Sequence, residues 1–260
     1  MRSVRGEIHI SADPGALTRS AAEEFVRLAS DATELHGRCT VALSGGSTPT
    51  GLYALLASET DAFRGRVPWN RMHFFWGDER HVPPDHAESN YRIAYDALLS
   101  QVPIPTDHVH RIRAENSDAG KAAEEYEQDL RESFGLDEGE WPRFDLVLLG
   151  MGPDGHTASL FPGTAVLDER KRLVAASWVE HLNTTRITLT PPVLNNAACV
   201  IFLISGQEKA QTLRAVLTGD FRPVRLPAQL IRPGRGRLLW LVDRAAAGLL
   251  DLHGEIASSS

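Results

Sequence analysis

One stretch, residues 145–163 (DLVLLGMGPDGHTASLFPG), constrains the possible fold more than any other part of the chain. Residues 144–149, which begin just before it, are apolar except for Asp145 and have the length of a strand, as expected for a strand buried on both faces. The run stops at a series of helix- and strand-breaking residues: Gly150, Gly152, Pro153 and Gly155. A central strand that ends in a tight loop favours a parallel α/β sheet.

That loop carries an acid and an imidazole two residues apart, Asp154 and His156. Ligands bind at the carboxyl ends of parallel strands, and imidazole is the side chain that titrates near neutral pH. The pair is therefore a candidate catalytic site, although a histidine in a turn can also be a surface or capping residue. The glycines resemble the GxGxxG dinucleotide fingerprint only in part, because no helical run with a distal acid follows them.

Further apolar runs at residues 39–43, 72–76, 199–204 and 238–242 predict more central strands, and residues 7–10 an edge strand. Helical patterns separate them, the first opened by Asp13 as the N-terminal cap and the last predicted at residues 244–250. We expect residues 173–179 and 186–189 to be strands as well. This pattern predicts one Rossmann-like α/β domain, residues 1–257: a doubly wound, mostly parallel sheet with helices on both faces and a disordered tail at 258–260.

The composition and charge of the chain limit the classes of partner that it is expected to bind. A formal net charge of -7 argues against nucleic acid, which is bound by extended basic surfaces. No apolar run is long enough to cross a bilayer and the N-terminus lacks the apolar core of a signal peptide, so we expect no membrane partner and a cytoplasmic protein. Cys39 and Cys199 lie in apolar runs, which favours reduced, buried thiols over a disulfide or a metal site.

The segment SGGST, after the strand at residues 39–43, is a second candidate site. Its glycines free backbone amides, and the helix that follows adds a partial positive charge, so it is typical of a phosphate-binding turn. We expect Thr48 to cap that helix and Pro49 to be its first residue. The spacing and lysine of a P-loop are absent, and an ordinary glycine-containing capped loop is the alternative.

Two cations follow other strand ends. Arg80 stands in a loop, GDERHVP, where it could bind phosphate oxygens through its planar guanidinium or only pair with neighbouring acids. Lys209 opens the helix after residues 199–204, although a lone lysine there is usually a surface residue. Because carboxyl ends of parallel strands share one edge, all four loops are expected to converge on one cleft.

Assembled, these residues resemble the 6-phosphogluconolactonase family, within the wider group that includes the glucosamine-6-phosphate deaminases. The similar segments are VALSGGSTP, FFWGDERHVPPDHAESNY, LVLLGMGPDGHTASLFPGT, RITLTPPVLNNA, IFLISGQEKA and LPAQLI. The resemblance implies a Rossmann-like sheet, a sugar-phosphate lactone as the small-molecule partner, and neither metal nor cofactor. It implies hydrolysis of 6-phospho-D-glucono-1,5-lactone to 6-phosphogluconate, in the oxidative pentose phosphate pathway.

Residue by residue, the resemblance implies His156 as the general base with Asp154 beside it. It also implies that Arg80, Lys209 and the turn Gly45, Gly46, Ser47 and Thr48 bind phosphate. Ser89, Asn90 and Arg186 lie in matching segments and are further substrate-binding candidates. The chain could be a monomer or a small homo-oligomer.

Two other functions remain open. Deaminases of this group continue from the DGH histidine to Asn-Glu-Pro, whose glutamate supports that histidine; here Ser159, Leu160 and Phe161 precede Pro162, so the carboxylate is missing. A sugar-phosphate sensor without turnover is the second alternative, and retention of both Asp154 and His156 counts against it. A serine hydrolase is not indicated, since no GxSxG motif occurs.

Overall fold

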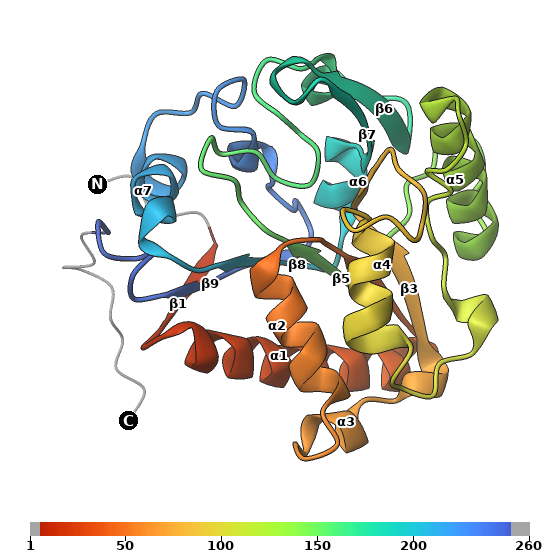
Figure 1. The fold of residues 1–260 in the computed structure, drawn as a ribbon, viewed down its shortest axis with the longest axis vertical. Helices are drawn as coiled ribbons and strands as arrows, with labels where there is room; N and C mark the ends of the chain where they lie inside the picture. The colour runs from red at the N-terminus through yellow and green to blue at the C-terminus, as the bar shows by residue number, and fades with distance from the viewer. Residues whose placement is uncertain (1–5, 251–260) are drawn as a thin grey trace.

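The computed structural model describes residues 6–250. Its main sheet has six strands in the order β1-β9-β8-β5-β2-β3, and every neighbouring pair is parallel (Figure 1). The strands are β1 (Glu7–Ser11), β9 (Arg237–Asp243), β8 (Cys199–Ile204), β5 (Leu146–Leu149), β2 (Cys39–Leu43) and β3 (Met72–Trp76). The predicted mostly parallel α/β sheet is confirmed, with β1 at one edge.

The central strands β2, β5 and β8 are almost entirely apolar in sequence. Every residue of β2, β5 and β8 is buried, which requires packing on both faces of the sheet. In Figure 1, α1 and α2 lie on one side of the sheet and α6 lies on the other. The helices are α1 (Pro14–His36), α2 (Ser47–Ala57), α3 (Phe63–Arg66), α4 (Asn90–Ala94), α5 (Ala119–Phe134), α6 (Pro191–Asn196) and α7 (Ala210–Thr218).

A second, antiparallel sheet of three strands was not predicted as a unit. It consists of β4 (Asp78–Arg80), β7 (Thr184–Leu189) and β6 (Val174–Val179), in that order. The prediction that Asp78–Arg80 belongs to a loop is therefore wrong. Three residues are too few to show a strand period in sequence, and β4 exists only because β7 supplies its hydrogen-bonding partner.

Two local predictions also need correction. Helix α2 begins at Ser47 after Gly46, so Thr48 is inside the helix and is not its cap. Gly46 adopts a φ of 102°, which lets the chain turn into the helix two residues early. Residues 244–249 form turns instead of the predicted closing helix: Asp243 accepts the amide of Ala246 as an N-terminal cap would, but Gly248 disfavours propagation of a helix beyond the first turn. The predicted tail at 258–260 lies outside the described residues.

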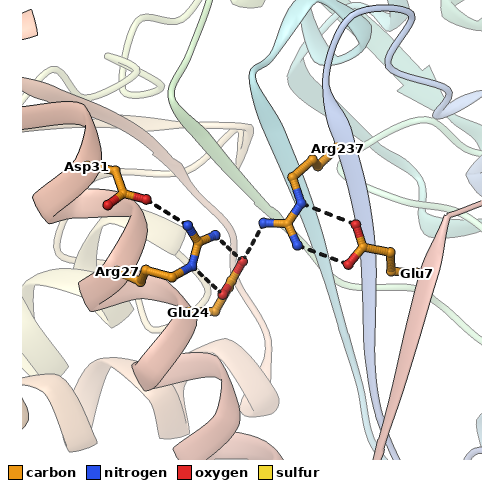
Figure 2. A network of polar contacts seen from close by, with 5 residues as sticks. All are labelled: Glu7, Glu24, Arg27, Asp31 and Arg237. Carbon is orange, nitrogen blue, oxygen red and sulfur yellow. Dashed lines mark hydrogen bonds and ion pairs between the residues drawn. The ribbon is translucent and has the colours of Figure 1, made fainter. Parts of the chain in front are cut away.

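An ion-pair network ties the edge strand to the rest of the protein (Figure 2). Arg237 of β9 binds Glu7 of β1 through two nitrogens, at 3.0 and 3.2 Å, and donates a third hydrogen bond of 2.8 Å to Glu24 of α1. Arg27, which also pairs with Asp31, donates to the same Glu24. The hydrogen bond from Arg27, and then that from Arg237, hold the pKa of Glu24 below its ordinary value despite burial, which raises it.

Replacing Arg237 with leucine is expected to lower the free energy of unfolding by about 1 kcal/mol, because two strands and one helix lose a shared cation. Urea denaturation at low ionic strength measures it, and the difference should shrink at about 1 M NaCl as screening weakens the pairs. Arg19→Leu, which removes one exposed pair with Asp61, is the matched control and should have a smaller effect. Equal effects would contradict a cooperative network.

Both cysteines are buried and free, as predicted. Burial raises the pKa of the Cys39 thiol, and raises that of Cys199 to about 11, so both thiols are protonated at neutral pH.

No helix between residues 6 and 250 has the length and apolarity to cross a bilayer.

Candidate active site

The candidate loops meet where the strand order reverses. After β2 the chain pairs β3 on one side of it, and then returns to place β5 on the other side. The turn after β2 and the loop after β5 therefore flank a topological switch point, where open α/β sheets bind ligands. A cleft of about 310 Å³ opens there, lined among others by Gly45, Gly46, Ser47, Thr48, Arg80, Asn90, His156 and Lys209. The predicted convergence of four loops is confirmed.

His156 and Asp154 form a close pair in this cleft. The ring Nδ1 of His156 lies 2.5 Å from Oδ1 of Asp154, which also accepts the backbone N–H of His156 at 3.1 Å. Partial burial raises the pKa of Asp154, but its hydrogen bond from His156 and the charge of that ring outweigh burial and lower the pKa overall. An ionised carboxylate can only accept, so Nδ1 carries the proton and Nε2 is left as the basic nitrogen.

Gly152 is required for this geometry. A methyl group added at Gly152 would lie 2.1 Å from Nδ1 of His156 and 2.6 Å from Oδ1 of Asp154. The pair therefore occupies the space that any larger residue would need. The backbone also closes the loop, because the amide of Gly152 donates to the carbonyl of His156 at 2.9 Å.

A second lobe of about 380 Å³ continues from the first at His156, Arg80 and Asp78. It contains Asp154 and Arg186 and is bounded by residues that sequence reasoning did not select: Asp78, Phe161, His181 and Leu182. Phe161 stacks on the His156 ring, with centroids 4.2 Å apart. The cleft thus has two lobes with the imidazole between them.

The turn after β2 presents free donors to the first lobe. The amides of Gly45, Gly46 and Ser47 have no acceptor among the described residues, and Ser47 is the first residue of α2. The first N–H groups of a helix have no intrahelical partner, and the helix dipole places partial positive charge there. Lys209, from the turn that precedes α7, lines the same lobe. This combination is suited to an anion such as phosphate.

Arg80 and Arg186 lie directly opposite each other in the antiparallel pair of β4 and β7. Like charges at such positions repel, and no ion pair is present for either residue within residues 6–250. Burial, and next the charge of Arg80, lower the pKa of Arg186. Two adjacent guanidinium groups without a direct ion pair in the described residues are suited to binding an anion at the cleft.

Ser89 is turned away from the cleft. It is 1% exposed, its hydroxyl donates to Oε2 of Glu79 at 3.1 Å, and it caps α4 by accepting the amide of Arg92. Glu79 also accepts the amides of Arg80, Asn90 and Tyr91. Burial raises the pKa of Glu79 in spite of these donors. Ser89 and Glu79 therefore join β4, which carries Arg80, to the start of α4, which carries Asn90.

Asn90 and Asp78 form the floor of the cleft. The amide nitrogen of Asn90 donates to the Asp78 carbonyl at 2.9 Å, which fixes the orientation of its side chain. Its Oδ1 faces Gly45, where an added methyl group would lie only 2.0 Å away. Asp78 accepts the hydroxyl of Ser159 at 2.6 Å and lines both lobes. The sequence signal that could have identified Asp78 as a cleft residue is its position two residues after the end of β3.

Comparison with known proteins agrees with this architecture. Residues 12–240 match the family model described as glucosamine-6-phosphate isomerases/6-phosphogluconolactonase. The chain belongs to this family. A Nostoc protein named 6-phosphogluconolactonase is 39% identical over 94% of this chain and 98% of its own length. A Synechocystis protein of the same name is 42% identical over 81% of this chain and 84% of its own.

Comparison with solved structures leads to the same family. The structure titled 6-phosphogluconolactonase from Trypanosoma cruzi superposes with a TM-score of 0.82 at 33% identity, over 96% of this chain and 98% of that one. The match includes both the six-stranded sheet and nearly the full described length, so the fold of the family is that of this chain. In the part described here, no group of three or more His, Cys, Asp or Glu residues could hold a metal ion.

Proposed function

We propose that the protein hydrolyses 6-phospho-D-glucono-1,5-lactone to 6-phosphogluconate, with His156 as the general base. The observation that carries the proposal is the His156–Asp154 pair, 2.5 Å apart, in a cleft bordered by Lys209, Arg80 and a helix N-terminus. Lactone hydrolysis needs a base, a water and an anchored substrate, and these residues supply the base and the anchor. Relatives at 39–42% identity are named for this activity.

The proton follows a simple path in this mechanism. Nε2 of His156 takes a proton from a water molecule while the water oxygen bonds to C1 of the lactone. The π electron pair of the C1 carbonyl moves onto the carbonyl oxygen. When the carbonyl re-forms, the bond between C1 and the ring oxygen breaks, and the imidazolium returns the proton to that oxygen. Asp154 holds the ring through Nδ1 and stabilises its charged form.

The phosphate end is anchored away from the reacting carbon. The free amides of the Gly45–Gly46 turn, the hydroxyls of Ser47 and Thr48, and the cations Arg80 and Lys209 are the proposed ligands. Arg186 adds charge beside Arg80, and Asn90 is a candidate for a sugar hydroxyl. Binding energy from this end can hold the lactone in the orientation that the attacking water requires.

The proposed function is tested by acid release from freshly generated 6-phosphogluconolactone, followed with and without the protein. The rate must exceed spontaneous opening in the same buffer. Ammonia release from glucosamine 6-phosphate in a parallel assay would instead identify a deaminase. Binding of sugar phosphates without acceleration of either reaction would leave only the sensor function.

Arg80→Ala and Lys209→Ala are each expected to raise KM for the phosphorylated lactone by about 10-fold or more, with a smaller change in kcat, because each removes a charged hydrogen bond worth about 1.5–3 kcal/mol. The assay is repeated with unphosphorylated glucono-1,5-lactone, on which the substitutions should have little effect. Arg19→Ala, which changes an exposed arginine of α1 that is not among the cleft residues, is the charge control. An equal loss on both lactones would contradict a phosphate contact.

A further inference from the structure

Phe161 has an unusual position for an apolar residue beside a catalytic pair. Its ring is 5% exposed and lies on the face of the His156 imidazole, with centroids 4.2 Å apart and planes 27° apart. The ring also makes an edge contact with His181, with centroids 5.5 Å apart at 67°. Phe161 therefore contacts two imidazoles, and one of them is the proposed base.

The three neighbours of the His156 ring define its orientation. Asp154 binds one edge through Nδ1, Gly152 leaves room for that contact, and Phe161 covers one face. A hydrogen bond to a single atom does not prevent the ring from tilting about that bond. A stacked aromatic ring does prevent it, because tilting would separate the two faces or force them to clash.

The same contact depends on the charge of the imidazole. The face of a phenyl ring carries partial negative charge and attracts a cation within about 6 Å of its centroid. A neutral imidazole gains less from this attraction than the imidazolium formed after it takes a proton. Phe161 therefore interacts more strongly with His156 once the water has been deprotonated, and only such differential interactions accelerate the reaction.

We propose that Phe161 is a positioning residue of the reaction, which holds the plane of the His156 ring and stabilises its protonated form during the attack of water. The inference rests on the proposed role of His156 as the base. It assigns a function to an apolar residue that cannot exchange a proton. His181 makes a further ring contact with Phe161.

The test compares Phe161→Leu with Phe161→Tyr. Leucine keeps an apolar side chain but has no aromatic face, so kcat should fall about 5- to 10-fold with KM changed less than about 2-fold. Tyrosine keeps the face and should return kcat to within about 2-fold of the original protein. Phe221→Leu, at a half-exposed phenylalanine outside both lobes, is the control and should leave kcat unchanged.

Proton NMR of the unsubstituted protein gives an independent readout if Phe161→Leu does not fold. The ring protons of His156, assigned as those missing from His156→Ala, should be shifted upfield by the ring current of Phe161. Absence of that shift, or equal kcat for the leucine and tyrosine variants, overturns the inference. If His156→Ala keeps full activity the proposed base is wrong; if it is inactive while Phe161→Leu keeps its original kcat, only the role of Phe161 fails.

Discussion

Replacing His156 with alanine is expected to lower kcat by about 100-fold or more, the usual contribution of a positioned acid–base group. Among the described residues that line the cleft, His156 alone combines a free ring nitrogen with a carboxylate that holds its other nitrogen, and the variant loses it. KM should change little, since the proposed phosphate ligands are untouched. Initial rates of acid release are compared after subtraction of spontaneous lactone opening.

A substitution of Asp154, the partner of His156, tests the same assignment of the base. Asp154→Asn removes the negative charge that stabilises the protonated ring, yet it keeps the size of the side chain, so we expect a loss of more than about 10-fold in kcat. His36→Ala, at an exposed histidine in the last turn of α1, is the control and should be fully active. A His156→Ala variant with nearly unchanged kcat would refute the assignment of the base.

The parallel sheet was predictable because its strands carry their own signal. The strands β2, β5 and β8 are apolar except for Thr40 of β2, and short apolar runs that end at glycine or serine are recognisable as buried strands. Strand β4 has no such signal. Its residues 78–80 resemble a polar loop, and only their pairing with residues 186–188 of β7, distant in sequence, makes them a strand. Long-range pairing of short polar segments is not encoded locally.

The residues of the candidate site also fall into those that the sequence indicated and those that it did not. Asp154, His156 and the SGGST turn were recognisable because glycine, acid and imidazole concentrate at strand ends, where chemistry is expected. Phe161 was not, because a phenylalanine in an apolar segment usually belongs to the core. Its contact with His156 depends on how residues 157–160 return the chain, including a left-handed Ala158 with φ of 47°. The role of Ser89 was also hidden, since its hydroxyl binds Glu79.

Gly152→Ala is expected to reduce kcat about 100-fold although alanine differs by a single methyl group. That methyl would lie 2.1 Å from Nδ1 of His156 and 2.6 Å from Oδ1 of Asp154, so the pair must move by about 1 Å or more. A displacement of this size at a reacting group costs on the order of 100-fold in rate. Thermal unfolding should confirm that the variant is folded, and kcat is measured as for His156→Ala.

Gly150→Ala is the matched control for this substitution. Gly150 lies two residues earlier in the same loop, and a methyl group added there meets nothing within 4 Å. Neither glycine has a positive φ, so backbone strain does not distinguish the two variants, and only the collision with the His156–Asp154 pair does. Gly150→Ala should retain activity within about 2-fold, given that no group at the reacting centre is displaced. If both variants are equally active, catalysis does not depend on the geometry of the pair; if both are equally inactive, the loop as a whole, and not the pair, is sensitive to substitution.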